Sequence, residues 1–313
     1  MAMINEFKIF SGTSNRPLAE KIAGELDKKV SECTLKRFSD GEIFFQIDEN
    51  IRGMDVFIIQ STNPPADYLM ELLIMVDACR RASASRITAV IPYYGYARQD
   101  RKDMPRVAIT AKLVANLIIK SGVDRVVLMD LHASQIQGFF DCPSDHLYSS
   151  KVFNEHIKKL DLQPGVAVSP DVGSIKLVRA FAKELNYSIA IVDKRRPDIN
   201  KAEVMSIIGE VEGKNIIIRD DLIDTAGTLT EAAKYLKERG AKRIIAACTH
   251  GVLSGKAIER LKNSPIEKLY ISDTIFNPPE RSYSKIEILS VSHVFSEAIL
   301  RIHEEKSLSS LFQ

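Results

Sequence analysis

The chain is predicted to be an α/β protein built from two parallel-sheet domains. Short apolar runs rich in β-branched residues alternate with stretches of helical period along the 313 residues. Such alternation is typical of βαβ units, in which helices cover a parallel sheet. The apolar runs are continuous rather than alternating, which favours strands buried on both faces. The length suits about two domains of roughly 150 residues each.

The apolar runs are the candidate strands. In open parallel sheets, ligands bind beyond the carboxyl ends of the strands, so the loops that follow these runs are the expected places for a site. The candidate strands are Phe7–Phe10, Val56–Gln60, Ile87–Ile91, Val126–Met129, Val166–Ser169, Ser188–Val192, Ile216–Ile218, Arg243–Cys248 and Ile286–Ser290.

Three helices have the clearest apolar stripes. Pro64, Pro65 and Asp67 mark the start of the first helix, because proline and aspartate favour helix beginnings. Gly122 is a plausible end of the second helix, and Gly240 follows the third. The stripes are Leu69, Leu72, Leu73, Val76 and Cys79 in the first helix, Leu113, Val114, Leu117 and Ile118 in the second, and Leu229, Ala232, Ala233 and Leu236 in the third.

The two halves share an architecture. The first half reads ITAVIP, a basic loop YARQDRKD, a helix and the strand RVVLMD; the second reads SIAIVD, a basic loop KRRPDINK, a connecting segment and NIIIRD. The spacings differ, so the pattern indicates a duplicated fold rather than a sequence repeat. We expect a boundary near residues 146–150, with domains at 1–148 and 149–313. The C-terminal tail is free to return to the first domain.

The composition excludes several classes of protein. Lys plus Arg is 43 and Asp plus Glu is 41, so no overall field favours nucleic acid or a membrane surface. The N-terminus MAMINEFKIF lacks the long apolar run of a signal peptide. A cytoplasmic, soluble protein is expected. Four scattered cysteines without a CxxC pair read as reduced thiols: Cys33, Cys79, Cys142 and Cys248.

The stretch IIIRDDLIDTAGTLT at 216–230 has the pattern of a sugar-phosphate site. Asp220 and Asp221 follow a buried strand and can accept hydrogen bonds from hydroxyl groups. We expect Gly227 to permit a tight turn that points the amides of Thr225–Thr228 inward, where the following helix adds its positive N-terminal field. There is no GKS or GKT, so the turn is not a Walker loop. A capped helix with solvated acids is the structural alternative.

This stretch resembles the sugar-phosphate loop of type I phosphoribosyltransferases and, more closely, that of ribose-phosphate pyrophosphokinases. The resemblance to the second family extends over nearly the whole chain. The matching segments are KRFSDGE (36–42), RGMDVFIIQS (52–61), MELLIMVDACRRASASRITAVIPYYGYARQDRKD (70–103), AKLVAN (111–116), MDLHASQIQGFFD (129–141), SPDVG (169–173), THGVLSG (249–255) and SLSSLF (307–312).

The resemblance implies an activity and a fold. Ribose-phosphate pyrophosphokinases transfer the diphosphoryl group of MgATP to the C1 hydroxyl of ribose 5-phosphate, giving 5-phosphoribosyl 1-diphosphate and AMP for nucleotide biosynthesis. They have two phosphoribosyltransferase-like domains and use magnesium (Mg2+). A homohexamer built from dimers is expected, with phosphate or ADP as effectors, and with no nucleic-acid or membrane partner.

The family motifs also imply roles for residues of this chain. Asp171 ends a predicted strand and its oxygen donors suit magnesium; the resemblance adds His132 as a second metal ligand at the ATP site, with Asp130 supporting it. Lys194 and Arg196 on the basic loop are the expected catalytic pair, although such charge runs are usually solvated. ATP is expected at Phe38, Asp40, Glu42, Arg98, Gln99 and His132, and ribose 5-phosphate at Asp220, Asp221, Asp224, Thr225, Ala226, Gly227 and Thr228.

A regulatory site between subunits is the last implication. Relatives often have Asn at the position of His146, so nucleotide recognition there is an open question. The other histidines, at 156, 250, 293 and 303, are expected to be structural. The matching regulatory positions are Arg52, Lys102, Arg106, Ser134, Gln137, Asp145, His146, Ser307, Ser309 and Phe312.

Two alternatives compete with this interpretation. A phosphoribosyltransferase shares the DDLIDTAGT loop but typically has one such domain, and it consumes the sugar diphosphate. A non-catalytic homologue would keep the fold and bind active subunits, but it typically carries insertions or lacks active-site residues. Here His132, Asp171, Lys194 and Arg196 are all present, and the catalytic loop has no obvious insertion.

Overall fold

The computed structural model describes residues 6–195, 204–279 and 283–311. The chain divides into two compact units. Unit 1 comprises Met1–Tyr148, Thr274–Phe276 and Ser290–Gln313, and unit 2 comprises Ser149–Asp273 and Asn277–Leu289. The first cut therefore falls between 148 and 149, and the segment after residue 289 is grouped with unit 1 rather than with unit 2.

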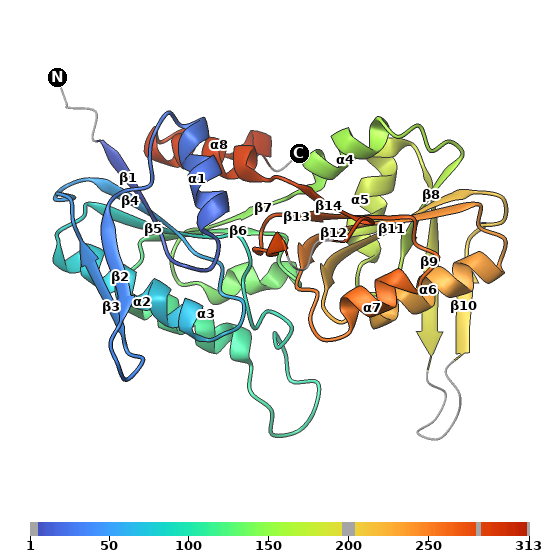
Figure 1. Ribbon diagram of the computed structural model, residues 1–313, viewed down its shortest axis with the longest axis horizontal. Coiled ribbons are helices and arrows are strands. Elements are labelled where there is room, and N and C mark those ends of the chain that lie inside the picture. Colours follow the sequence, from blue (N-terminus) through green and yellow to red (C-terminus); the bar gives the residue numbers. More distant parts are fainter. Residues whose placement is uncertain (1–5, 196–203, 280–282, 312–313) are drawn as a thin grey trace. The chain divides into compact units, whose positions relative to one another are not determined.

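Unit 1 is built on a parallel sheet with the strand order β1-β4-β5-β6-β7 (Figure 1). A separate antiparallel hairpin is formed by β2 and β3. The elements are β1 (Phe7–Ser11), α1 (Arg16–Glu25), β2 (Cys33–Arg37), β3 (Ile43–Ile47), β4 (Asp55–Ile59), α2 (Asp67–Arg81), β5 (Arg86–Ile91), α3 (Thr110–Ser121), β6 (Arg125–Met129), the 3-10 helix η1 (Ser134–Phe139), β7 (Ser144–Leu147), α8 (Ser292–His303) and the 3-10 turn η3 (Ser309–Leu311).

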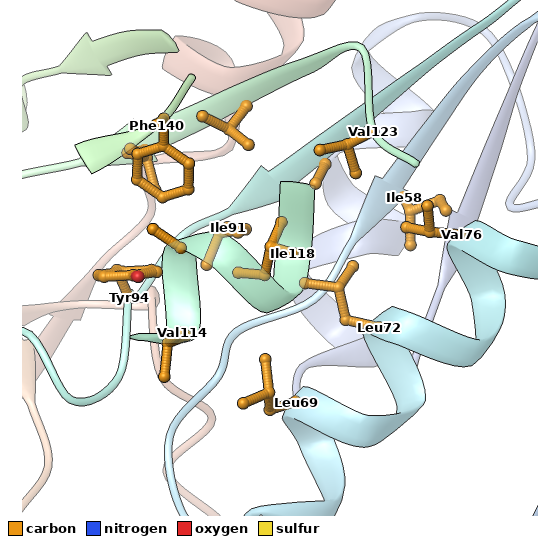
Figure 2. Packing of buried hydrophobic residues seen from close by; sticks show 14 of the residues in the cluster. Ile58, Leu69, Leu72, Val76, Ile91, Tyr94, Val114, Ile118, Val123 and Phe140 are labelled. Carbon is orange, nitrogen blue, oxygen red and sulfur yellow. The ribbon is translucent and has the colours of Figure 1, made fainter. Parts of the chain in front are cut away.

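Helices cover both faces of this sheet, with α2 and α3 on one face and α1 and α8 on the other (Figure 1). Figure 2 shows Leu72 and Val76 of α2 packed with Ile58 of β4 and Ile118 of α3. These side chains are buried. Continuous apolar strands such as DVFII, buried along its whole length, are what a doubly covered sheet requires.

The apolar stripe predicted for α3 is partly wrong. Leu113 and Leu117 are 53% and 42% exposed, whereas Val114 and Ile118 are buried as expected. The buried face also uses Ala111 and Ala115, which share it at a spacing of three and four residues. This helix is apolar over more than one face, so period alone did not identify the buried one. Gly122 ends it in the left-handed conformation, as predicted.

Unit 2 is built on a sheet with the order β10-β9-β8-β11-β12-β13-β14. Among its described strands, β10 pairs antiparallel with β9, and the other pairs are parallel. The elements are α4 (Ser150–Lys158), β8 (Gly165–Ser169), α5 (Ile175–Leu185), β9 (Ser188–Arg195), β10 (Val204–Ile208), β11 (Asn215–Ile223), α6 (Gly227–Glu238), β12 (Arg243–Gly251), α7 (Ala257–Lys262), β13 (Lys268–Ser272) and β14 (Ile286–Leu289).

Two apolar layers sandwich the sheet of unit 2. Side chains of α6 and α7 form one layer, and the stripe Leu229, Ala232, Ala233 and Leu236 is buried there as predicted. Side chains of α4 and α5, including Phe153, form the other layer. Both units are thus parallel sheets covered on both faces, which confirms the predicted fold class.

Two expectations from composition were also checked against the described residues. No helix in the described ranges combines the length and hydropathy needed to cross a bilayer. The four cysteines are free thiols, as their scattered spacing predicted. Burial raises the pKa of the Cys79 thiol to about 12, so this side chain behaves as a small apolar group in the core of unit 1.

Replacement of Leu72 by alanine should lower the free energy of unfolding by about 2–5 kcal/mol, because it leaves a cavity in a close-packed core. Met70 on the same helix is 51% exposed, and Met70→Ala should change stability by less than about 0.5 kcal/mol. Denaturant unfolding of both variants tests this. Equal losses would show that the packed face of α2 has been assigned wrongly.

Candidate active site

Polar loops gather at the carboxyl edge of the sheet in unit 2. Strand β11 pairs in parallel with β8 and with β12, so the chain leaves all three strands at the same edge. The end of β11 is hydrogen-bonded to the segment after β12, since Val252 N and Leu253 N donate to the carbonyl of Ile223. The acids predicted for sugar binding lie at this edge.

Asp220 is held by its neighbours in an unfavourable environment. Its Oδ1 accepts hydrogen bonds from Ser174 Oγ at 2.6 Å and from Asp221 N at 2.9 Å. Burial raises the pKa of Asp220 well above its ordinary value, and the adjacent Asp221 carboxylate raises it further. The bond from Ser174 acts in the opposite direction, and Asp171 adds to the repulsion. An oxygen-rich, electrostatically strained patch is therefore built into the sheet edge.

Asp171 lies in the loop that follows β8. Its Oδ1 accepts from Gly173 N at 2.8 Å and from Ser174 N at 3.1 Å, and Ser169 Oγ donates to its carbonyl at 2.6 Å. These bonds orient the half-buried carboxylate and lead the chain into α5. Ser174 joins the two acids, because its amide binds Asp171 and its hydroxyl binds Asp220.

The predicted phosphate turn lies between β11 and α6. Ala226 has φ 59°, whereas Gly227 begins the helix. The left-handed residue of the turn is thus Ala226 rather than Gly227, at which the sequence predicted a tight turn. A β-carbon at Gly227 would meet Arg260 and Thr225 only at ordinary contact distances. The left-handed alanine is a strained feature that the surrounding contacts must hold.

Those contacts come from the segment after β12 and from α7. Ser254 Oγ donates to Asp224 Oδ1, and Ser254 N donates to the Asp224 carbonyl at 3.0 Å. Arg260 Nη1 donates to the carbonyl of Thr225 at 2.8 Å. Thr225 and Thr228 are exposed at the start of a 12-residue helix. Exposed hydroxyls and a helix N-terminus together make a surface suited to an anion.

The proposed catalytic pair is only partly within the described chain. The backbone of Lys194 lies in β9 and is paired with Met205 of β10. Arg196 lies outside the described residues. The placement of these cations against a substrate stays a prediction.

In unit 1, His132 follows β6 at the carboxyl edge of that sheet and is exposed. The turn before it is fixed by Asp130, which has φ 37°, and by Leu131, whose amide donates to His146 Nε2 at 2.9 Å. His146 is buried in β7 and its ring lies 4.5 Å from that of Tyr148. His146 thus supports the turn that presents His132.

Arg98 and Gln99 lie on the exposed loop after β5. The carbonyl of Gln99 accepts from Ala111 N at 3.1 Å, which anchors the loop to the start of α3. Gln135 Nε2 donates to Asp100 Oδ2 at 3.0 Å, and this bond joins the loop to the η1 segment that follows His132. The predicted nucleotide residues of two neighbouring strand ends are therefore brought together.

The third group of predicted nucleotide residues lies on the β2–β3 hairpin. Phe38 is 50% exposed at the tip, and Asp40 Oδ1 accepts from Glu42 N at 3.0 Å. Arg37 ties the hairpin to α2, because its guanidinium lies 3.0 Å from the Asp67 carboxylate and 3.8 Å from that of Glu71. The hairpin therefore presents the Phe38 ring beside Asp40 and Glu42, and Arg37 attaches the hairpin to α2.

The predicted regulatory positions are placed in several environments of unit 1. Asp145 is ion-paired with Arg125, and both line a pocket of about 430 Å³ with Arg86, Lys306 and Ser309. Ser307 Oγ and Ser309 Oγ are 2.8 Å apart. Phe312 lies outside the described residues. Arg52 donates to Ser83 Oγ at 3.2 Å, while Arg106, Ser134 and Gln137 are exposed and His146 is buried.

Comparisons with known proteins agree with this geometry. Residues 7–122 match the family model of the N-terminal domain of ribose phosphate pyrophosphokinase, and residues 197–313 match the phosphoribosyl synthetase-associated domain. The chain is 58% identical to the ribose-phosphate pyrophosphokinase of Chlorobaculum tepidum, over 99% of this chain and 96% of that protein. It is 54% identical to the Thermotoga maritima enzyme over the full length of both. The chain belongs to the ribose-phosphate pyrophosphokinase family.

A solved structure supports the same assignment. The phosphoribosylpyrophosphate synthetase of Mycobacterium smegmatis superposes with a TM-score of 0.91 and 39% identity, covering 96% of this chain and all of that one. Membership of this family thus accounts for the fold of both units. It confirms the resemblance drawn from the motifs.

Several residues that shape the candidate site were missed from the sequence. Ser174, Ser254 and Arg260 each bind a predicted site residue, but each is a common residue in a loop or short helix. The segments SPDVG and THGVLSG pointed to the regions of the first two. Arg219 carried a signal, since an arginine after three isoleucines is unusual for a buried strand.

Asp220→Asn should stabilise the fold at neutral pH. When the pKa of a carboxyl group is higher in the folded than in the unfolded state, the free energy of unfolding falls as the pH rises between the two pKa values. It stays lower at higher pH. Removing the charge should raise the free energy of unfolding by about 1 kcal/mol or more at pH 7.5, and the gain should shrink as pH is lowered. Thermal unfolding across pH tests this, with the exposed ion-pair variant Asp77→Asn as control. A gain independent of pH would contradict it.

Proposed function

We infer that the chain transfers the diphosphoryl group of ATP to the C1 hydroxyl of ribose 5-phosphate, giving 5-phosphoribosyl 1-diphosphate and AMP. The observation that carries this inference is the end of β11, where two acids precede a strained turn that opens a helix. Full-length similarity to ribose-phosphate pyrophosphokinases supports the same reaction.

The β11 segment suits a phosphorylated pentose. We assign the 5-phosphate to the turn 224–228, where amides and the hydroxyls of Thr225 and Thr228 donate at the N-terminus of α6. Asp220 and Asp221 accept from the ring hydroxyls, which a carboxylate does well because it has only acceptor oxygens. The raised pKa of Asp220 is relieved when hydroxyl donors approach it.

The reaction forms one bond and breaks one. The C1 oxygen of the sugar attacks the β-phosphorus of ATP and loses its proton, while the bond from that phosphorus to the bridging oxygen of AMP breaks and leaves its electron pair on AMP. Lys194 and Arg196 neutralise the charge that develops on the phosphoryl oxygens. The substrate hydroxyl is the nucleophile, so no covalent enzyme intermediate is needed.

The residues present fit magnesium as the cofactor. The carboxylate of Asp171 is oriented by two backbone amides and is half-buried at the sheet edge, as an oxygen ligand should be. His132 would contribute a nitrogen from unit 1. Magnesium usually keeps several waters and takes few protein ligands, so two side chains suffice to hold it. Bound magnesium would neutralise triphosphate charge.

The nucleotide side draws on unit 1. Arg98 and Gln99 bind the phosphates with His132, and a guanidinium suits them because it donates in a planar fork. Phe38 stacks on adenine, and Asp40 and Glu42 accept from its amino group. We further propose that a neighbouring subunit supplies this hairpin within a homohexamer, and that phosphate and ADP act at the regulatory positions around Asp145 and Ser309.

Phosphorus NMR of a mixture with ribose 5-phosphate, ATP and magnesium tests the reaction. We expect AMP and a sugar diphosphate to appear together. A phosphoribosyltransferase would instead consume added phosphoribosyl diphosphate with a base, and a non-catalytic homologue would do neither. Either result would overturn the proposed function.

Lys194→Ala should lower kcat by roughly 100-fold or more, because a cation that acts on the developing charge is lost. Affinity for ribose 5-phosphate should stay nearly unchanged. Steady-state kinetics and calorimetric binding measure the two effects, and Lys176→Ala, an exposed change on α5, is the matched control. Weaker sugar binding with normal turnover would contradict the role of Lys194.

Arg37→Gln should raise KM for ATP several-fold, since it releases the hairpin from Asp67 and Glu71. KM for ribose 5-phosphate should change by less than about twofold. Arg81→Gln, which loses an ion pair with Asp77 at the end of α2, is the control. Equal changes in both KM values would exclude a role specific to the nucleotide.

A further inference from the structure

Arg219 is the one side chain of β11 whose presence the proposed chemistry does not explain. It stands between the buried run Asn215–Ile218 and the acids at Asp220 and Asp221. Its relative exposure is 0%, and it is the largest of the fully buried side chains in the described chain. An aliphatic residue would suit this position of a doubly covered sheet better.

The guanidinium of Arg219 joins three elements. Nη2 donates to Thr249 Oγ1 of β12 at 2.9 Å and to Ser149 Oγ, just before α4, at 3.2 Å. The guanidinium carbon lies 4.5 Å from the ring centre of Phe153 in α4. Nη1 donates to the carbonyl of Asp220. Burying a charged group costs free energy even when the group is hydrogen-bonded. Replacing such a group by an apolar side chain often leaves the stability of the protein unchanged or raises it.

The bond to Asp220 acts on one peptide unit. The carbonyl of Asp220 and the amide of Asp221 belong to the same rigid plane. Arg219 holds the carbonyl end of this plane, and the Asp220 carboxylate accepts from the amide end at 2.9 Å. Ser174 then holds the same carboxylate at 2.6 Å. The orientation of the plane sets the direction in which the side chains of both acids leave the backbone.

We propose that Arg219 is a positioning residue for sugar binding, which orients the Asp220–Asp221 peptide so that both carboxylates can accept from adjacent hydroxyls of a pentose phosphate. The inference rests on the proposed function and deepens it. Arg219 acts through the acids, since its guanidinium donates to Asp220 of β11, to Thr249 of β12 and to Ser149 just before α4. Its charge also lies near those of the half-buried acids, because Asp220, Asp221 and Arg219 all act on the pKa of the Cys248 thiol.

The test compares Arg219→Met with the wild-type chain. Methionine keeps a long apolar side chain but loses the donors and the charge. We expect the Kd for ribose 5-phosphate, measured by calorimetry without nucleotide, and its KM to rise on the order of tenfold. KM for ATP should stay within about twofold. Arg219→Lys should restore part of the sugar affinity, because it keeps the charge and loses the planar fork.

Two control variants separate positioning from packing. Phe181→Leu on α5 disturbs the same apolar layer, and Arg243→Met removes an exposed arginine at the opposite end of β12. Both should bind ribose 5-phosphate as the wild type does. Unchanged sugar affinity in Arg219→Met, or an equal loss in Phe181→Leu, would overturn the inference.

The variants and the wild type together distinguish a folding defect from a failure of the proposed function. If Arg219→Met does not fold, Arg219→Lys serves as the test variant. We expect its KM for ribose 5-phosphate to rise while its KM for ATP does not. An unchanged KM for ribose 5-phosphate would overturn the inference. Wild-type protein that neither binds nor turns over ribose 5-phosphate would overturn the proposed function and the inference with it. Wild-type activity together with a normal Arg219→Met enzyme would overturn the inference alone.

Discussion

The parallel pairing of β11 with β8 and β12 is the constraint on which the rest of the proposed sugar site depends. Because parallel strands run in one direction, three loops leave the sheet at one edge, and the polar groups in those loops must find partners there. Ser174 satisfies Asp171 and Asp220 together, and Ser254 satisfies Asp224. A polar surface is thereby assembled from loops that lie far apart along the sequence.

That edge is locally unfavourable. Burial and the neighbouring Asp221 carboxylate disfavour the charged form of Asp220. Ala226 adopts a left-handed backbone conformation, which L-residues disfavour. Unit 1 repeats the second device, since Asp130 after β6 also has a positive φ. The apolar layers on both faces of each sheet supply the stability that such positions consume. The strained residues at the strand ends are therefore held in place by the rigid sheets that carry them.

Much of this could be predicted from the sequence, where the signal is repeated along the chain. Continuous runs such as Ile216–Ile218 indicated buried parallel strands, and the period of Leu229 to Leu236 indicated the buried face of α6. The exposed Leu113 was misjudged because α3 is apolar on more than one face. The left-handed backbone of Ala226 was not predicted because glycine is the usual left-handed residue, and here tertiary bonds override that preference. Ser174 and Ser254 act through distant partners, which no local pattern records.

The order of segments along the chain has a consequence for biosynthesis. Unit 1 takes its first 148 residues from the start of the chain and the helix α8 from near its end, with unit 2 translated in between. The ribosome therefore completes every strand of the first sheet long before it delivers the helix that covers one of its faces, where Ser292 and Ser296 bond to Glu25 of α1. During that interval, the nascent chain exposes an apolar sheet face that α1 covers only in part, and chaperones are best placed to act there.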